Sequence, residues 1–197
     1  MIWRERESRP ARVNGSSAFR RRLAGLERSG VAVRILTQNV DGLHRSAGSS
    51  ARKVLELHGA MREVVCTGCR RRTPSEQTMA RVRAGADDPR CVDCGAVLKL
   101  AVVLFGEHLD PATTGLAGRI AANAQLMLAV GSSLSVEPVA SLCAVAVNAG
   151  NRLVIVNRDP TPYDELAAEV IREPIGVALP RICAALAGAS TVGGYAV

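Results

Sequence analysis

Aromatic residues and lysine are scarce in this chain of 197 residues. Trp, Tyr and Phe make up 3% of the sequence, and the only lysines are Lys53 and Lys99. The formal net charge of +7 therefore comes almost entirely from arginine. A basic chain is a candidate for binding nucleic acid, but the arginines are interspersed with Ala, Val and Gly, and few rings are present for base stacking. The composition argues against nucleic acid as a partner.

Long apolar runs are absent as well. No stretch of about eighteen uncharged apolar residues is present that could span a membrane, and residues 1–15 lack the apolar centre of a secretory leader. We therefore expect a cytoplasmic protein with no membrane partner. With 48% hydrophobic residues, the chain can bury one core and carry a small second module.

The six cysteines are unevenly placed. Cys143 and Cys183 stand alone in apolar, helix-like segments and are expected to be buried as small hydrophobic residues. The others form two Cys-x-x-Cys pairs, which in an unsecreted chain indicate a metal site far more often than disulfides. Four thiolates around zinc leave no open position for water or substrate, so the predicted site is structural. Its expected ligands are Cys66, Cys69, Cys91 and Cys94.

Strand-like and helix-like segments alternate through most of the chain. Apolar runs that predict strands cover residues 33–36, 54–57, 98–104, 126–130, 153–156 and 169–172. Helices are expected over 16–29, 111–123, 138–148 and 174–186. This alternation predicts an α/β fold, a Rossmann-like doubly wound parallel sheet. We assign residues 16–62 and 99–188 to it, residues 63–98 to an inserted zinc-binding module, 1–15 to a disordered arm and 189–197 to a loose tail.

Polar residues follow several of these runs, where ligands bind in open α/β sheets. Gln38, Asn39 and Asp41 follow the first run, and Asn157 follows 153–156. The small residues 131–133 stand between a strand and a helix, an arrangement in which backbone N–H groups attract phosphate. Each motif alone also fits an ordinary turn.

Two further segments have a structural and a functional interpretation. A lone histidine such as His58 is more often structural, although Gly59 after it permits close approach of the backbone to a ligand. The run 98–104 ends at Phe105-Gly106-Glu107 and is either a core strand with a turn or an edge that pairs with an extended peptide.

Taken together, TQNVDGLH, ELHG, the two Cys-x-x-Cys pairs, VVLFGE, VGSSLSVEP and IVNRD occur in the order and approximate spacing of the sirtuins. Over residues 17–187 the chain resembles the bacterial branch of this family of NAD-dependent protein lysine deacylases. The resemblance implies NAD as co-substrate, structural zinc, and acylated lysine of proteins as the partner. It also implies transfer of the acyl group from lysine to ADP-ribose with release of nicotinamide.

The resemblance assigns roles to individual positions. His58 matches the general base that acts on a ribose hydroxyl, a task suited to a neutral imidazole. The positions that match the family's NAD contacts are Gln38, Asn39, Asp41, Gly131, Ser132, Ser133 and Asn157. The positions that match its substrate-peptide contacts are Val103, Phe105, Gly106 and Glu107.

One departure from the family pattern lies at the front of the chain. The Gly-Ala-Gly-x-Ser strand and loop, which bind the pyrophosphate in such proteins, are not found before Ser16. We therefore expect the sheet to be N-terminally incomplete. Two hypotheses follow: an NAD-dependent deacylase, or a truncated sirtuin-like fragment or pseudoenzyme that binds zinc and a peptide without catalysis.

Overall fold

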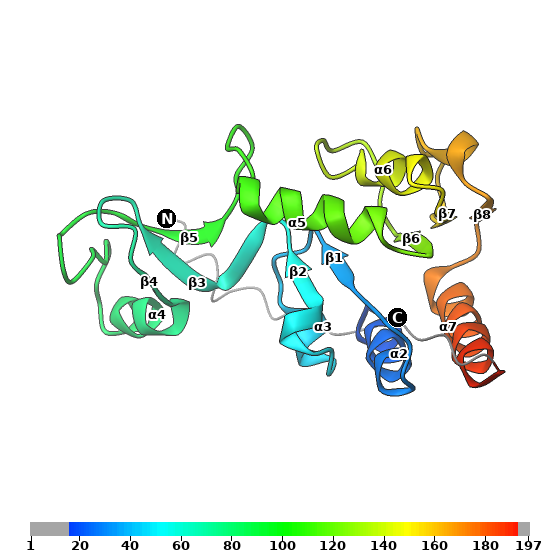
Figure 1. Ribbon diagram of the computed structural model, residues 1–197. Helices are drawn as coiled ribbons and strands as arrows, with labels where there is room; N and C mark the ends of the chain where they lie inside the picture. Colours follow the sequence, from blue (N-terminus) through cyan, green and yellow to red (C-terminus); the bar gives the residue numbers. More distant parts are fainter. Residues whose placement is uncertain (1–15, 193–197) are drawn as a thin grey trace.

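The computed structural model describes residues 16–192, arranged as alternating strands and helices with a small antiparallel module at one end (Figure 1). The helices are α2 (Ser16–Arg28), α3 (Leu43–Ser46), α4 (Ser75–Arg83), α5 (Pro111–Ala122), α6 (Leu142–Asn148) and α7 (Ile175–Val192). The strands are β1 (Ile35–Thr37), β2 (Val54–Glu56), β3 (Gly59–Cys66), β4 (Arg72–Pro74), β5 (Leu98–Val102), β6 (Leu126–Val130), β7 (Arg152–Val156) and β8 (Glu169–Ile171). The predicted arm, 1–15, lies outside the described residues.

All strand pairs outside the antiparallel module are parallel within the described residues. β1 pairs with β2, and β6, β7 and β8 form a three-stranded sheet in that order. The predicted α/β class with parallel strands is therefore confirmed. Within residues 16–192, however, the parallel strands form two separate hydrogen-bonded sheets and not one continuous sheet. In Figure 1, β1 and β2 lie between the antiparallel module and the β6–β8 sheet.

The core depends on close helix contacts made possible by small side chains. Ala117 and Ala121 of α5 are fully buried against Ala146 of α6 in one apolar cluster. Leu153 and Ile155 of β7 are the largest fully buried side chains and pack in a second cluster, on the β6–β8 sheet. Burying an aliphatic side chain of this size contributes about 2 kcal/mol. These clusters fix α5 and α6 against the strands that lead to the site.

A third cluster joins the two ends of the described chain. Leu26 of α2 packs on Leu179 and Cys183 of α7. Cys143 is buried in the cluster around β7. The prediction that both lone cysteines are buried among apolar side chains is confirmed.

The antiparallel module contains three strands in the order β4-β3-β5 together with α4. β3 and β5 pair from Gly59 with Val102 to Cys66 with Leu98, with an irregularity between Ala60 and Val64. The sheet therefore extends beyond the expected module, 63–98, at both ends. A short apolar run fits a parallel or an antiparallel strand equally well, so the sequence alone did not reveal which sheet residues 99–102 join.

Two helices differ from their predicted bounds. α6 begins at Leu142 and not at Pro138, because residues 137–141 form turns. α7 continues to Val192, which places residues 189–192 of the predicted tail in a helix. The alanines near the end of α7 favour helix and supply no stop signal. The described part of the chain contains no helix with the length and apolar character needed to cross a membrane.

Candidate functional site

His58 lies in the short connection between β2 and β3, where it contacts two other segments. Its Nδ1 atom is 3.2 Å from the backbone carbonyl oxygen of Gln38. Its own carbonyl accepts a hydrogen bond of 2.9 Å from the N–H of Val103. Because a carbonyl oxygen only accepts, the neutral imidazole carries its proton on Nδ1 and keeps the lone pair on Nε2. The histidine is therefore oriented with a basic nitrogen available.

The pairing of β1 with β2 accounts for the contact between His58 and Gln38. Thr37 is opposite Glu56 in the parallel register, and the N–H of Leu57 donates to the Thr37 carbonyl at 2.9 Å. Parallel strands that end together present the residues that follow them at the same edge. The polar residues predicted at the end of the first strand therefore meet the histidine that follows the second.

Gly59 allows β5 to approach directly behind the histidine. Its φ is +77°, and a Cβ atom at this position would lie only 2.1 Å from the carbonyl oxygen of Ala101. The sequence suggests that this glycine allows close approach of a ligand, whereas in the structure the backbone of β5 occupies the space that a side chain would need. Only glycine combines this φ with so close a strand.

The turn after β6 lies beside the loop after β1. Gln38 Nε2 donates to Ser132 Oγ at 3.5 Å, and Ser132 Oγ also accepts from the N–H of Leu134 at 3.2 Å. Gly131 has φ +62°, and its N–H donates to the carbonyl of Val156 at 2.9 Å. This last bond places Gly131 next to the end of β7.

No helix begins at this turn, which corrects the predicted strand-turn-helix arrangement. Residues 134–141 separate Ser133 from α6. An anion bound here would therefore meet loop N–H and hydroxyl groups and not the N-terminus of a helix. Ser133 itself is exposed, and its hydroxyl is 2.6 Å from that of Ser135.

Asn157 follows β7, as predicted, and is half-buried. Its side-chain Nδ2 donates to the carbonyl of Asp159 at 2.8 Å. Its own carbonyl accepts from Arg172 at 2.9 Å. These two bonds hold the start of the loop after β7 beside Arg172, which follows β8.

Asn39 and Asp41 are exposed at the same edge. The Asp41 carboxylate accepts from the N–H of Leu43 at 3.0 Å, and its other oxygen is 3.4 Å from the guanidinium of Arg20 on α2. Sequence reasoning missed Arg20. In the structure, Arg20 lies four residues before the fully buried Ala24, so both occupy the inward face of α2.

Amide, carboxylate, hydroxyl and imidazole groups thus gather at one edge from the loops after β1, β2 and β6. These groups suit a ligand with ribose hydroxyls and a carboxamide, because each can donate or accept a hydrogen bond.

The segment after β5 forms a closed turn with an exposed aromatic ring. The N–H of Glu107 donates to the Leu104 carbonyl at 2.9 Å, and the Glu107 carboxylate accepts from the Leu104 N–H at 3.0 Å. The ion pair with Lys99 and this N–H lower the pKa of the Glu107 carboxyl. Phe105, at the tip of the turn, is 100% exposed. Within residues 16–192, β5 is an edge strand with no partner on its outer side.

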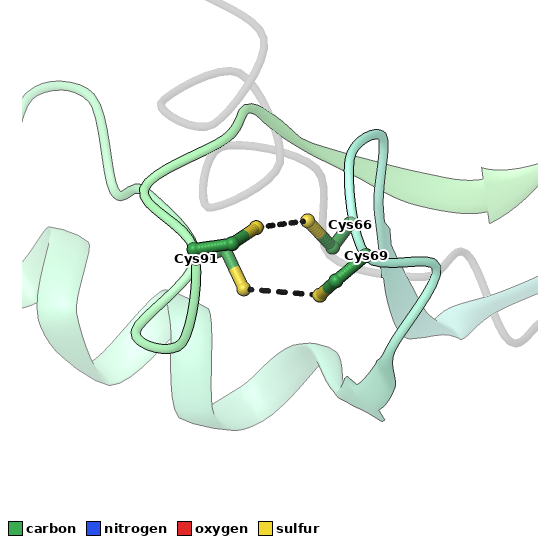
Figure 2. A group of neighbouring side chains, drawn as sticks. Cys66, Cys69 and Cys91 are labelled. Atoms are coloured by element: carbon green, nitrogen blue, oxygen red, sulfur yellow. Dashed lines mark hydrogen bonds between the residues drawn. The ribbon is translucent and has the colours of Figure 1, made fainter.

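The four predicted zinc ligands meet at the tips of two loops. Their sulfur atoms all lie within 4.8 Å of one another. Figure 2 shows the Cys69 and Cys91 thiols facing each other, at an Sγ–Sγ distance of 3.7 Å. Zinc with four bonds of about 2.3 Å spaces its sulfur ligands about 3.8 Å apart. The cluster therefore fits structural zinc, with every coordination position filled by protein.

The surroundings of the cysteines support metal binding. Burial opposes ionisation of Cys66, but N–H groups of the loop and the Cys94 thiol lower its pKa to about 6. For Cys69, the backbone N–H of Arg71 favours ionisation, but the neighbouring thiols and burial raise the pKa to about 12, so the first charge in the cluster opposes a second. Arg71 forms an ion pair with Asp93 that joins the two loops. A Cβ atom on Gly68 would lie 2.8 Å from Ala96, so the first loop depends on glycine.

Comparison with known proteins identifies the family. A model of the Sir2 family matches residues 3–138. The chain belongs to the Sir2 family. It is 59% identical over 180 residues to NAD-dependent protein deacetylase 2 of Streptomyces coelicolor, covering 91% of this chain and 75% of the relative. It is 47% identical over 160 residues to the NAD-dependent protein deacetylase of Sulfolobus acidocaldarius, covering 81% and 62% respectively.

Solved sirtuin structures share the fold of this Sir2-family chain. A complex of Sir2 with a p53 peptide and NAD+ matches with a TM-score of 0.76 and 32% identity, covering 89% of this chain and 70% of that one. Sir2Tm bound to a propionylated peptide matches with a TM-score of 0.78 and 29% identity, covering 98% and 79%. Sirtuin homologues bind acetylated peptides.

Proposed function

We propose that this Sir2-family chain is an NAD-dependent protein deacetylase, and that His58 is its general base. The observation that carries the proposal is the position of His58. Its Nδ1 is held by the loop after β1, and its carbonyl is held by Val103 at the end of the edge strand β5. One residue thus connects the polar edge with the strand suited to a peptide.

The chain's own groups support each part of this reaction. His58 would take a proton on Nε2 from a ribose hydroxyl, because hydrogen bonding already assigns the Nδ1 proton to the Gln38 carbonyl. When bound, NAD supplies the ribose that receives the acyl group and the nicotinamide that leaves. The residues that we propose orient NAD are Gln38, Asn39, Asp41, Gly131, Ser132, Ser133 and Asn157.

We propose that the acylated lysine of a protein substrate lies along β5 and the turn after it. An extended peptide can add through main-chain hydrogen bonds to the outer edge of β5, which has no strand partner within residues 16–192. The residues that would line it are Val103, Phe105, Gly106 and Glu107. Zinc in the Cys66 cluster would hold the module that carries this strand and take no part in the chemistry.

The test is NAD-dependent deacetylation of an acetyl-lysine peptide, and the measured quantity is the nicotinamide released. We expect turnover by the unaltered chain and a loss of roughly 100-fold or more in kcat for His58→Ala, the usual range for losing a general base. His108→Ala, at an exposed histidine, is the matched control and should retain activity. Equal turnover by His58→Ala and the unaltered chain would refute the role of His58.

The alternative, a fragment or pseudoenzyme, predicts a different outcome. It gives no NAD-dependent turnover by the unaltered chain and no NAD affinity in calorimetry, while zinc and peptide still bind. Micromolar NAD affinity together with turnover would exclude it. A cytoplasmic location, expected from the sequence, stays a prediction.

A further inference from the structure

Arg20 is a buried arginine that reaches from α2 to the polar edge. Its side chain is 4% exposed, and a terminal guanidinium nitrogen lies 3.4 Å from the Asp41 carboxylate. The Arg20 guanidinium carbon is also 4.9 Å from the centre of the Phe19 ring. A guanidinium does not lose its proton in proteins, so its burial is costly unless it meets an opposite charge. One carboxylate that it meets, that of Asp41, belongs to the proposed NAD site.

Asp41 is held from the protein side through both of its oxygen atoms. Oδ1 accepts from the N–H of Leu43, and Oδ2 faces Arg20. The carboxylate nevertheless stays 39% exposed. Its orientation is therefore set by the protein while part of it faces solvent, as a ligand-orienting group requires.

The other charged groups near Asp41 do not take over the ion pair that Arg20 forms with it. Glu56, the other carboxylate nearby, pairs with Arg45 at 3.5 Å and Arg62 at 2.6 Å. His44 lies buried in α3, and the pKa of its imidazole is lowered by burial and then by the charge of Arg20, against the opposing effects of Asp41 and Glu56. Burial and Arg20 both favour the uncharged imidazole, so His44 is a poor alternative cation for Asp41. Among the described residues, Arg20 is the cation that pairs with Asp41.

We propose that Arg20 is a positioning residue that acts through Asp41 to orient NAD, an inference that rests on the proposed function. Because the Arg20 side chain is 4% exposed and that of Asp41 is 39% exposed, we expect the carboxylate and not the guanidinium to face the ligand. Replacing Arg20 should therefore change the KM for NAD, and only while residue 41 carries a carboxylate.

A double-mutant cycle tests this dependence. We expect Arg20→Met to raise the KM for NAD about tenfold, a typical coupling between contacting residues, and to change the KM for the acetyl-peptide by less than about twofold. In an Asp41→Asn background, the same Arg20→Met change should have no further effect on the KM for NAD. Arg22→Met is the matched control on the same helix, and its kinetics should equal those of the unaltered chain.

Arg20→Lys keeps the charge but not the planar fork and should give an intermediate KM for NAD. If Arg20→Met lowers thermal stability too far to assay, the cycle is run with Arg20→Lys. An Arg20 effect of equal size with and without the Asp41 carboxylate would overturn the proposal, as would an equal rise in the peptide KM.

The same cycle measured by calorimetric NAD binding separates this inference from the proposed function. If the chain binds NAD without turnover, the deacetylase function is refuted. The role of Arg20 can still be tested, from the coupling between Arg20→Met and Asp41→Asn in the Kd for NAD. A chain that does not bind NAD would overturn both.

Discussion

The glycine behind His58 links the position of the histidine to the fold. We expect Gly59→Ala to lower the free energy of unfolding by more than about 2 kcal/mol, because the added methyl meets the Ala101 carbonyl and strains a positive φ. Activity should fall with it, since the His58–Val103 hydrogen bond depends on the same strand contact. Urea unfolding and the deacetylation assay measure the two effects.

Gly118→Ala provides the matched control for that substitution. Gly118 lies in α5 with no atom within 4 Å of an added Cβ. Alanine there should stabilise the helix by up to about 1 kcal/mol. Equal stability of the two variants would show that the close contact between Gly59 and β5 does not contribute to the free energy of unfolding.

His44 should make stability depend on pH. Its pKa is lowered in the folded chain by burial and by Arg20, so below pH about 6.5 the unfolded chain binds a proton that the folded chain resists. The contribution of His44 is therefore fully present above that pH and declines as pH falls below it. We expect His44→Gln to flatten the fall in unfolding free energy between pH 7 and pH 5, measured by urea titration. His108→Gln should leave the fall unchanged.

At the scale of single elements, a substitution in the turn after β5 can change peptide binding without changing thermal stability. Phe105 is fully exposed, and exposed substitutions rarely change stability by more than about 0.5 kcal/mol. We expect Phe105→Ala to keep the thermal midpoint and to raise the KM for an acetyl-peptide several-fold, without a matching rise for NAD. An unchanged peptide KM would remove this turn from the proposed substrate site.

The separation along the sequence between interacting residues decides which parts of the site could be predicted. Gln38 and His58 could be predicted to meet, since both follow strands and parallel strands end at one edge. The run containing Ala101 was recognisable as a strand, but its antiparallel partner is set by tertiary pairing. Arg20 was missed for the same reason, because its carboxylate partner is 21 residues away.

The start of α6 shows how a distant contact overrides a local preference. Proline is favoured in the first turn of a helix, which is why Pro138 predicted the start. Instead, Glu137 accepts from the N–H of Ser141 at 3.1 Å and from the hydroxyl of Tyr163 at 3.1 Å. Tyr163 lies beyond β7, so no local rule includes it. The loop after Gly131 is longer as a result.

At the scale of the whole molecule, zinc should stabilise the antiparallel module more than the parallel sheets. We propose that residues 59–102, with the three antiparallel strands and α4, form a module that depends on the metal, while the parallel sheets have apolar clusters of their own. Small metal-bound modules gain much of their folding free energy from the ion. Amide hydrogen exchange after chelation should therefore show lost protection in β3, β4 and β5 and retained protection in β7.

Substitution of single cysteines tests the same division without a chelator. We expect Cys69→Ala to reduce bound zinc from one ion per chain to none, because three thiolates leave the tetrahedron open, and deacetylation should fall as β5 loses its support. Cys143→Ala removes a buried thiol outside the cluster and should keep full zinc content, measured by metal analysis. Loss of zinc with unchanged protection in β5 would mean that the edge strand is held by its pairing with β3 alone, and that the metal serves only the loop tips.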